Sequence, residues 1–358
     1  MDNIGNENKD TVAPSKKKMK RWKKVLLIIG IVLGILLLAV GITAAVYLSR
    51  INYETEEDNQ IKTELENVSS EVATESNAGQ IEDTEQIKNF LLIGVENIGY
   101  GENSDKGNTD CLIVLSINQE KDTVKMISFM RDLYVTMPEL NKATKLNNVY
   151  NNGGAKLLTQ TIEKNFGITI DGRAVVKFSD FEKIIDLLGG VTVELTGQEA
   201  RYLNSTNYIS NPANRRMVEG KNHLNGNQAL GYSRVRKIPT KSGKNGNEGR
   251  NERQRKVLMA IYTKYKEKSL VKLTALVYDV LPLIYKTNIS ATDAIDVVGA
   301  VKDMDIKKIK SINVPKNGTF HSQHAVPGIS TSVMNDFTII DNWKANREWI
   351  KEFITGEK

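Results

Sequence analysis

The sequence has few of the residue types that most often carry covalent chemistry. It contains one cysteine, Cys111, among 358 residues, so no intramolecular disulfide can form. Cys111 begins the apolar run CLIVL, which predicts a buried structural thiol rather than a nucleophile. The three histidines, His223, His321 and His324, lie outside any nucleophile motif. HExxH, GxSxG and the P-loop are all absent from the sequence. These absences argue against a histidine-ligated metalloenzyme and against a serine triad.

Positive charge is concentrated near the N-terminus, although the whole chain has a net charge of +6 and a pI near 9.0. Much of the excess comes from Lys16, Lys17, Lys18, Lys20, Arg21, Lys23 and Lys24. Because an apolar segment follows this cluster directly, we interpret the cluster as the flank of a membrane segment. We expect no nucleic-acid partner.

A long run without any charged residue covers residues 25–48. As a helix it would extend about 36 Å at about 1.5 Å per residue, enough to cross a ~30 Å hydrocarbon layer with some tilt. The apolar part of a cleaved secretory signal is usually ~7–15 residues long, so an uncleaved anchor is favoured over that closest alternative. A buried core helix is disfavoured by the length of the run and by the basic cluster before it. The positive-inside rule then places residues 1–24 in the cytoplasm and everything after Arg50 outside the cell.

The segment after the expected anchor, residues 49–87, is acidic and polar. Such a composition buries too little surface to offset the entropy of ordering the chain, so it predicts an extracellular stalk. The folded extracellular domain is expected from residue 88 to residue 358. A hydrophobic content of 40% is enough for a real core.

Predicted strands and helices alternate through this domain, which indicates a layered α/β fold. Strands are expected at residues 90–94, 111–117, 123–129, 174–178, 191–195 and 309–314. Helices are expected at residues 157–166, 179–188, from 250 onward, 273–284, 291–301 and 343–354. The polar segments 201–222 and 237–248 are expected to be exposed loops near the functional site.

Two carboxylates stand at the ends of predicted neighbouring strands. Glu96 follows the first strand, and Asp110 precedes the second. If the two strands pair in antiparallel fashion, both carboxylates lie at the same edge of the sheet. Two carboxylates with positions left for phosphate oxygens and water suit Mg²⁺. The alternative is that both residues cap strand ends in solvent.

A second group of residues is suited to binding an anion. It consists of Arg131, Arg234, Arg236, Arg250, Arg253 and Gln254. Arg234 and Arg236 point the same way if the chain is extended there, and the last three residues lie on consecutive turns of one predicted helix. Guanidinium groups bind phosphate oxygens bidentately, and burying several together is costly unless an anion neutralises them. Outside a membrane, such a group favours a phosphorylated lipid, whereas the alternative is a solvated basic helix face.

In this order along residues 89–268, the motifs resemble those of the LytR–CpsA–Psr family of membrane-anchored extracellular enzymes. The matching segments are Leu91-Leu92-Ile93-Gly94, Asp110, Ser128-Phe129-Met130-Arg131-Asp132, Lys145-Leu146-Asn147 through Tyr150, Gly153-Gly154, Gly189-Gly190-Val191, Tyr232-Ser233-Arg234-Val235-Arg236 and Arg250-Asn251-Glu252-Arg253-Gln254-Arg255.

The resemblance implies a three-layer α/β/α sandwich with a central mixed sheet, preceded by one transmembrane helix, and a hydrophobic tunnel that receives a lipid. It implies transfer of a glycopolymer, such as a teichoic acid, from a polyprenyl-diphosphate carrier onto a peptidoglycan hydroxyl by phosphoryl transfer. Asp110 and Glu96 would hold Mg²⁺ on the diphosphate. Its oxygens would be bound by Arg131, Arg234, Arg236, Arg250, Gln254 and Arg253. Catalysis is assigned to Arg131, Asp110, Arg234 and Arg236, and Asp132 is expected to orient Arg131.

The sequence departs from the family pattern at four positions. Glu96 stands where Asp is usual, Asn108 and Ile98 stand where Arg is common, and Asn247 replaces an expected Asp. These departures motivate an alternative function, a non-catalytic polyprenyl-phosphate-binding factor for envelope assembly. Transcriptional regulation by direct DNA binding conflicts with the expected extracellular location of the arginines.

Overall fold

The computed structural model describes residues 45–62, 65, 68–69, 87–96, 107–118, 120–121, 123–266, 268, 270–290, 293, 309–327, 329 and 336–356. The chain divides into two compact units, Met1–Ser49 and Arg50–Lys358. The expected anchor, residues 25–48, lies outside the described residues except for its last four, which are helical. The predicted helix at 291–301 also lies outside them, apart from Asp293. Within the described ranges, no helix has both the length and the apolar character needed to cross a membrane.

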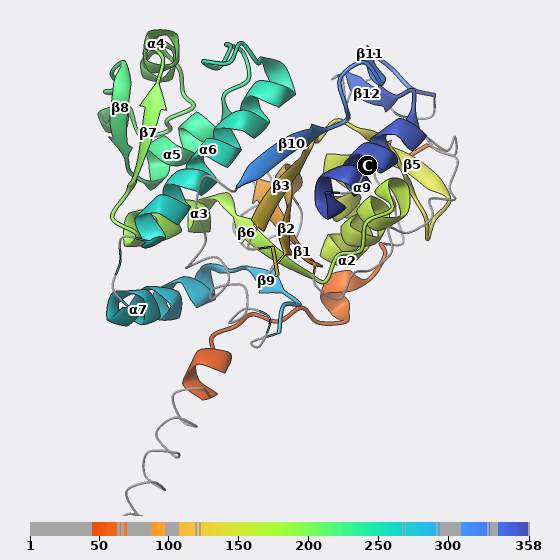
Figure 1. The fold of residues 1–358 in the computed structure, drawn as a ribbon, viewed down its shortest axis with the longest axis horizontal. Coiled ribbons are helices and arrows are strands. Elements are labelled where there is room, and N and C mark those ends of the chain that lie inside the picture. The colour runs from red at the N-terminus through yellow and green to blue at the C-terminus, as the bar shows by residue number, and fades with distance from the viewer. Residues whose placement is uncertain are drawn as a thin grey trace, which may run out of the picture. The chain divides into compact units, whose positions relative to one another are not determined.

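The second unit is built on a six-stranded mixed sheet with the strand order β10-β3-β2-β1-β6-β9 (Figure 1). The strands are β1 (Ile87–Glu96), β2 (Asn108–Asn118), β3 (Thr123–Phe129), β6 (Gly172–Lys177), β9 (Lys286–Thr287) and β10 (Lys310–Val314). Strands β1, β2 and β3 form an antiparallel meander, and β9 is antiparallel to β6. Strand β6 runs parallel to its neighbour β1, and strand β10 runs parallel to its neighbour β3. The predicted central mixed sheet is confirmed.

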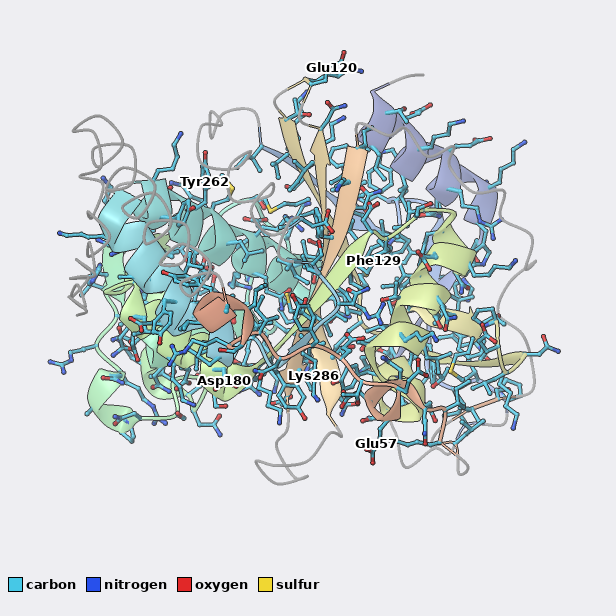
Figure 2. The ribbon with its side chains drawn as sticks, turned by 90° about the horizontal axis from the view of Figure 1, so that it is seen from below. Glu57, Glu120, Phe129, Asp180, Tyr262 and Lys286 are labelled. Carbon is cyan, nitrogen blue, oxygen red and sulfur yellow. The ribbon has the colours of Figure 1, made fainter. Side chains whose placement is uncertain are left out.

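Helices cover both faces of this sheet (Figure 1). On one face α2 (Leu146–Phe166) and α9 (Trp343–Thr355) pack over the main core. On the other face lie α3 (Phe178–Leu187), α5 (Gly226–Arg234) and α6 (Gly246–Lys266). Side chains alternate between the two faces of a strand, so Leu91 and Ile93 of β1 enter the α2 core while Leu92 faces α3 and α6. Phe129 lies inside the domain (Figure 2), with its ring centroid 4.8 Å from that of Phe166.

Three small antiparallel sheets surround the central one. They pair β4 (Tyr134–Met137) with β5 (Lys142–Lys145), β7 (Val191–Leu195) with β8 (Gly220–Leu224), and β11 (Phe320–Gln323) with β12 (Phe337–Ile340). The remaining described elements are α4 (Gly197–Ser205), α7 (Leu270–Val280), η1 (Glu57–Asn59), η2 (Pro212–Asn214) and η3 (Leu281–Leu283). The predicted loop at 201–222 is therefore partly regular structure, since it contains the end of α4, all of η2 and the start of β8.

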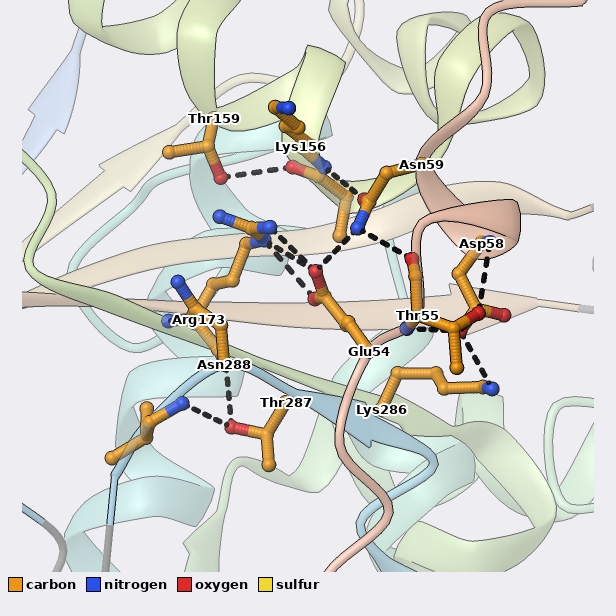
Figure 3. Close-up of polar contacts among 12 residues, drawn as sticks. Glu54, Thr55, Asp58, Asn59, Lys156, Thr159, Arg173, Lys286, Thr287 and Asn288 are labelled. Atoms are coloured by element: carbon orange, nitrogen blue, oxygen red, sulfur yellow. Dashed lines mark hydrogen bonds and ion pairs between the residues drawn. The ribbon is translucent and has the colours of Figure 1, made fainter.

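The first part of the predicted stalk is instead a folded component of the domain. We call residues 50–62 the strap. Glu54 accepts two hydrogen bonds from Arg173 Nε, at 3.0 and 3.1 Å, and its side chain is only 4% exposed (Figure 3). Asp58 pairs with Lys286 at 2.9 Å, and the amide of Lys62 donates to the carbonyl of Asn152 at 2.9 Å. The acidic composition was misleading because two of the strap's carboxylates, Glu54 and Asp58, are paired with cations of the domain.

Candidate active site

The two predicted metal-binding carboxylates lie at one edge of the sheet, as their positions at strand ends predicted. Glu96 is opposite Asn108 in the antiparallel ladder of β1 and β2. A register shift after Gly94 pairs Gly94 with Cys111 and Val95 with Thr109, so Asp110 is the extra residue of a β-bulge. A bulge re-aims a side chain, and here it places Asp110 among the arginines of neighbouring elements.

Asp110 is the centre of this cluster and is 7% exposed. Arg131, just after β3, donates a short hydrogen bond to Asp110 Oδ1, and its Nε lies 3.1 Å from Asp132 Oδ1. Arg250 of α6 places a terminal guanidinium nitrogen 3.6 Å from the same Asp110 oxygen. One helical turn later, Gln254 Nε2 donates to the Asp110 carbonyl at 2.9 Å. Three segments that are far apart in the sequence therefore converge on one carboxylate.

Arg234 and Glu96 form the outer part of the cluster. Arg234 is the last residue of α5, and its guanidinium donates a short hydrogen bond to Glu96 Oε1. The guanidinium also lies 5.2 Å from the centroid of the Phe178 ring. Arg236 is half-buried, and no carboxylate pairs with it in the part of the chain that the structure describes. Its positive charge contributes to lowering the pKa of Arg250, so it acts electrostatically on the cluster.

The pKa shifts reflect how densely these charges are packed. Burial alone would raise the pKa of Asp110, but Arg250 and Arg131 outweigh it and the net pKa is lowered. Burial is the main reason that the pKa of Arg250 falls to about 10, and the nearby Arg131 and Arg236 add to the effect. For Glu96, burial and the charge of Asp110 raise the pKa against the opposing effect of Arg234.

Several buried polar atoms of the cluster have no hydrogen-bond partner. They are Arg131 Nε, which lies near Asp132 without hydrogen-bond alignment, together with Arg250 Nε and Gln254 Oε1. Buried donors without acceptors are uncommon in proteins, and each costs free energy until an acceptor arrives. Unpaired guanidinium nitrogens in a cationic cluster suit an anion with several oxygens.

An apolar cavity of about 200 Å³ adjoins the cluster on the α3–α6 face of the sheet. Arg234 and Gln254 belong to its lining, so the cavity and the cluster share an edge. The apolar part of the lining comes from β1, β6, α3, α5 and α6 and includes Leu92, Val176, Phe181, Ile184, Leu230, Leu258 and Ile261. Cys111 also lines it and is partly exposed, and burial raises the pKa of its thiol to about 12, which favours the predicted structural role over a nucleophile.

Arg253 is a correction to the predicted set. Its side chain is fully buried and pairs with Glu199 of α4 at 2.9 Å. The other guanidinium nitrogens donate to the carbonyls of Val235 and Ile238. All of its donors are committed to protein acceptors away from Asp110, so Arg253 holds α6 against α4 and the loop after α5.

Sequence reasoning missed the part played by two asparagines. Asn247, which we had noted only as a departure from the family pattern, donates from Nδ2 to Asp132 at 2.6 Å and accepts from Arg250 at 3.2 Å. Asn151 of α2 is 1% exposed and accepts a 2.8 Å hydrogen bond from the amide of Gly107, just before β2. The signal for Asn151 was a run of asparagines at the start of a helix, where buried amides need partners.

The carboxylates of the cluster do not by themselves enclose a metal ion. Across the described residues, no group of three or more His, Cys, Asp or Glu side chains is placed to hold one. Asp110 and Glu96 are close enough for the charge of Asp110 to raise the pKa of Glu96. Two carboxylates can bind Mg²⁺ when substrate oxygens and water complete its coordination.

Comparison with known proteins places this arrangement in a recognised group. The chain is 30% identical over 294 residues to the polyisoprenyl-teichoic acid–peptidoglycan teichoic acid transferase TagU of Bacillus licheniformis, covering 82% of this chain and 87% of that protein. It shares its fold with the crystal structure of Bacillus subtilis TagV, with a TM-score of 0.60, 24% identity, and coverage of 76% and 99%. A second similar structure is the LytR-CPS2A-psr family protein YwtF (TagT) with bound octaprenyl pyrophosphate lipid, at a TM-score of 0.55 and 22% identity, covering 79% and 96%. The profile of the LytR_cpsA_psr family matches residues 44–345, and the chain therefore belongs to this family.

Proposed function

We propose that this protein transfers a glycopolymer from a polyprenyl-diphosphate carrier to a peptidoglycan hydroxyl, as a phosphotransferase. The observation that carries the proposal is the shared edge between a cluster of arginines and an apolar cavity. A polyprenyl diphosphate has the matching two parts, an anionic diphosphate and an apolar chain. The activities named for TagU, and the lipid bound in the TagT structure, support the same substrate class.

The arginines are assigned to the diphosphate. Arg131, Arg234, Arg236 and Arg250 surround the position next to Asp110, and Gln254 faces both that position and the cavity. The unpaired Nε of Arg250 would donate to a phosphate oxygen. Because Arg131, Arg234, Arg250 and Gln254 are held by polar contacts before the substrate arrives, little reorganisation of these four side chains is needed on binding.

The reaction follows from this placement. The acceptor oxygen forms a bond to the phosphorus that bears the glycopolymer while the bridging P–O bond breaks, and polyprenyl phosphate leaves. The acceptor hydroxyl loses its proton, and negative charge accumulates on the phosphate oxygens. Arg131, Arg234 and Arg236 stabilise that charge, and Asp110 and Asp132 hold Arg131 in position. With water as the acceptor, the same site would act as a pyrophosphatase.

The donor set fits Mg²⁺ bound by Asp110 and Glu96. Four guanidinium groups against three carboxylates leave one excess positive charge, fewer than the charges on a disubstituted diphosphate. In the structure Asp110 is paired with Arg131, and Glu96 is paired with Arg234. Both carboxylates therefore compete with the phosphate for these arginines. When bound, Mg²⁺ would supply positive charge to the diphosphate oxygens. Calorimetric titration of Mg²⁺ into the parent chain and into Asp110→Asn tests this assignment without any measurement of turnover.

The location proposed for this reaction is the outer face of the cell membrane. Residues 1–24 would lie in the cytoplasm, residues 25–48 would form a single anchor, and the domain that follows would lie outside the cell as an α/β/α sandwich. The basic cluster before the apolar run supports this orientation.

The test is an assay of the full-length chain in detergent with a lipid-diphosphate-linked saccharide, a peptidoglycan acceptor and Mg²⁺. We expect a covalent product between saccharide and acceptor, together with polyprenyl phosphate. Folded protein that gives neither transfer nor diphosphate cleavage would contradict the proposal. Tight binding of polyprenyl phosphate without product would instead support the alternative of a non-catalytic envelope assembly factor.

A further inference from the structure

Helix α7 and the following turn η3 are composed mainly of apolar residues. The sequence LVKLTALVYDVLPL has one basic and one acidic residue. None of the side chains described in these two elements is buried, and Leu276, Val277, Val280 and Leu281 are partly exposed. A helix of a soluble protein buries its apolar stripe against the core. Among the described elements, α7 meets only α3 and η3 to any extent.

The strap brings the start of the domain to this helix. Arg50 donates to the carbonyl of Tyr278 at 2.9 Å, and its guanidinium lies 3.8 Å from the centroid of the same ring. Asn52 Nδ2 donates to the carbonyl of Ile284 at 2.9 Å. The proposed anchor ends at residue 48, so only about 7 Å of extended chain separates it from Arg50. If the anchor spans the membrane, the lipid surface must lie close to α7.

The residues around α7 have the composition of a membrane interface. Between residues 262 and 286 there are five lysines and two acidic residues. The basic residues are Lys264, Lys266, Lys268, Lys272 and Lys286, and four tyrosines occur in the same stretch. Lys266 and Lys272 are exposed. Tyrosine is enriched at membrane interfaces, and lysine is attracted by anionic headgroups.

The apolar cavity extends toward the same end of the domain. Helix α6 carries Gln254 at the arginine cluster and Ile261 in the cavity lining, about 10 Å further along its axis. It ends at Lys266, and α7 begins four residues later. A lipid chain would therefore leave the membrane at α7 and follow α6 to the arginines.

From these observations we infer that α7 and η3 form a membrane-contact surface, seated on an anionic phospholipid bilayer with the apolar side chains in its interface. The inference rests on the proposed membrane anchoring. It adds a second contact, so the domain is held at a fixed orientation on the bilayer.

The direct test uses full-length protein in nanodiscs of phosphatidylglycerol and phosphatidylcholine that contain a nitroxide-labelled lipid. Val277→Cys and Val280→Cys are labelled with a fluorophore, and Val218→Cys is the matched control because Val218 is 59% exposed on another part of the domain. The parent chain, with only Cys111, gives the background. We expect quenching at positions 277 and 280 to be at least about threefold stronger than at 218. Equal quenching at all three positions would overturn the inference.

A second test separates this surface from the active site. Charge reversal in Lys266→Glu/Lys272→Glu should reduce quenching of the label at 277, since each lysine near an anionic leaflet contributes about fivefold in affinity. It should also slow turnover of a bilayer-embedded donor without changing turnover of a short-chain soluble donor. Lys344→Glu/Lys351→Glu, on the exposed side of α9, is the control. If the parent turns over neither donor, the proposed function fails, yet the quenching result still decides the membrane contact.

Discussion

At the scale of single residues, the cluster contains an arginine that is costly to bury. Arg250 is 1% exposed and keeps an unpaired Nε, and burial is the main cause of its lowered pKa of about 10. Asp110 offsets part of that cost from 3.6 Å away. A bound phosphate would satisfy the remaining donor, so substrate binding should recover part of the cost of burying Arg250.

Arg234 is the residue whose loss should separate binding from stability. Its side chain is 25% exposed, and its main described partner is Glu96 at the edge of the sheet. Arg234→Ala should weaken the affinity for a polyprenyl diphosphate by about tenfold to a hundredfold, since a hydrogen bond between charged groups contributes ~1.5–3 kcal/mol. The melting temperature should change little.

Arg201→Ala, at an exposed position of α4, is the control for Arg234→Ala. Calorimetry with the lipid and thermal melting of both variants check this prediction. A drop in melting temperature without a loss of affinity would contradict it.

Arg253 should behave in the opposite way to Arg234, since its loss should reduce stability and leave lipid affinity unchanged. Its ion pair with Glu199 is buried on both sides, so Arg253→Ala leaves an uncompensated carboxylate and should cost about 3–5 kcal/mol of unfolding free energy. Arg253→Met together with Glu199→Leu should recover part of that loss. Urea denaturation measures both variants. The lipid affinity of the molecules that remain folded should match the parent, and a specific loss of affinity would restore Arg253 to the binding site.

At the scale of elements, the strap is fixed to the bend in α2. Gly153 and Gly154 interrupt the helical backbone there, and Gly154 has φ of +66°. A Cβ on Gly154 would overlap the carbonyl oxygen of Asp58. Asn151, which binds the amide of Gly107 next to β2, lies on the same stretch of α2. The strap therefore supports the part of α2 that holds the site edge of the sheet.

Gly154→Ala should consequently loosen the strap. Gly189→Ala is a matched control, because Gly189 has φ of +79° but open space where a Cβ would lie. The control should cost about 1–2 kcal/mol through backbone strain alone. Gly154→Ala should cost more and should speed hydrogen exchange in residues 50–62. Equal costs, with unchanged exchange in the strap, would show that the close contact is unimportant.

Strap docking should also weaken in acid. Burial alone would raise the pKa of Asp58, but Lys286 and Thr55 together outweigh it, so the net pKa lies below the ordinary value of 3.8. Because the pKa of Asp58 is lower in the docked strap than in a free one, its ion pair stabilises docking fully above about pH 3.8. This stabilisation is lost as the pH falls through the pKa that Asp58 has in the docked strap. Hydrogen-exchange protection of residues 50–59 should be constant from neutral pH to about pH 5 and should fall below about pH 4. Asp58→Asn should flatten this dependence, and constant protection of the parent down to pH 3 would contradict it.

The elements that sequence reasoning found are those with regular apolar patterns. β1, β2, β3 and β7 are continuous or alternating apolar runs, and α9 has a clear apolar stripe. The start of α2 was missed because its buried side chains include asparagines that bond to one another and to the backbone. The strap was missed because Glu54 and Asp58 are neutralised by residues more than a hundred positions away.

The residues of the candidate site also fall into those that the sequence could place and those that it could not. Asp110 and Glu96 were placed correctly because strand order and strand ends can be inferred from the sequence. Arg250 and Arg253 are three residues apart on one helix, and their spacing does not reveal that Arg250 faces Asp110 in the cluster whereas Arg253 pairs with Glu199 of α4. That distinction depends on the packing of α4 against α6, which is a tertiary contact.

At the scale of the whole molecule, the sheet and three helices enclose one cavity that no single element defines. Its lining comes from β1, β2, β6, α3, α5 and α6, and Arg234 and Gln254 join it to the arginine cluster. The proposed substrate needs both parts at once, the charged mouth for the diphosphate and the apolar interior for the chain. Changing the interior alone should therefore change the preference for chain length and leave phosphate recognition intact.

Ile261→Trp is the variant that tests this separation, because it fills the end of the cavity that lies away from the arginines. Each methylene removed from water contributes about 0.8 kcal/mol, so excluding only two of them should weaken a long-chain polyprenyl diphosphate by roughly tenfold. A short-chain analogue, which does not reach Ile261, should bind as it does to the parent. Val218→Trp adds the same side chain at an exposed position and controls for its general effects. Equal losses for both chain lengths would mean that the lipid chain does not occupy this cavity, and the lipid would have to bind along another face of the domain.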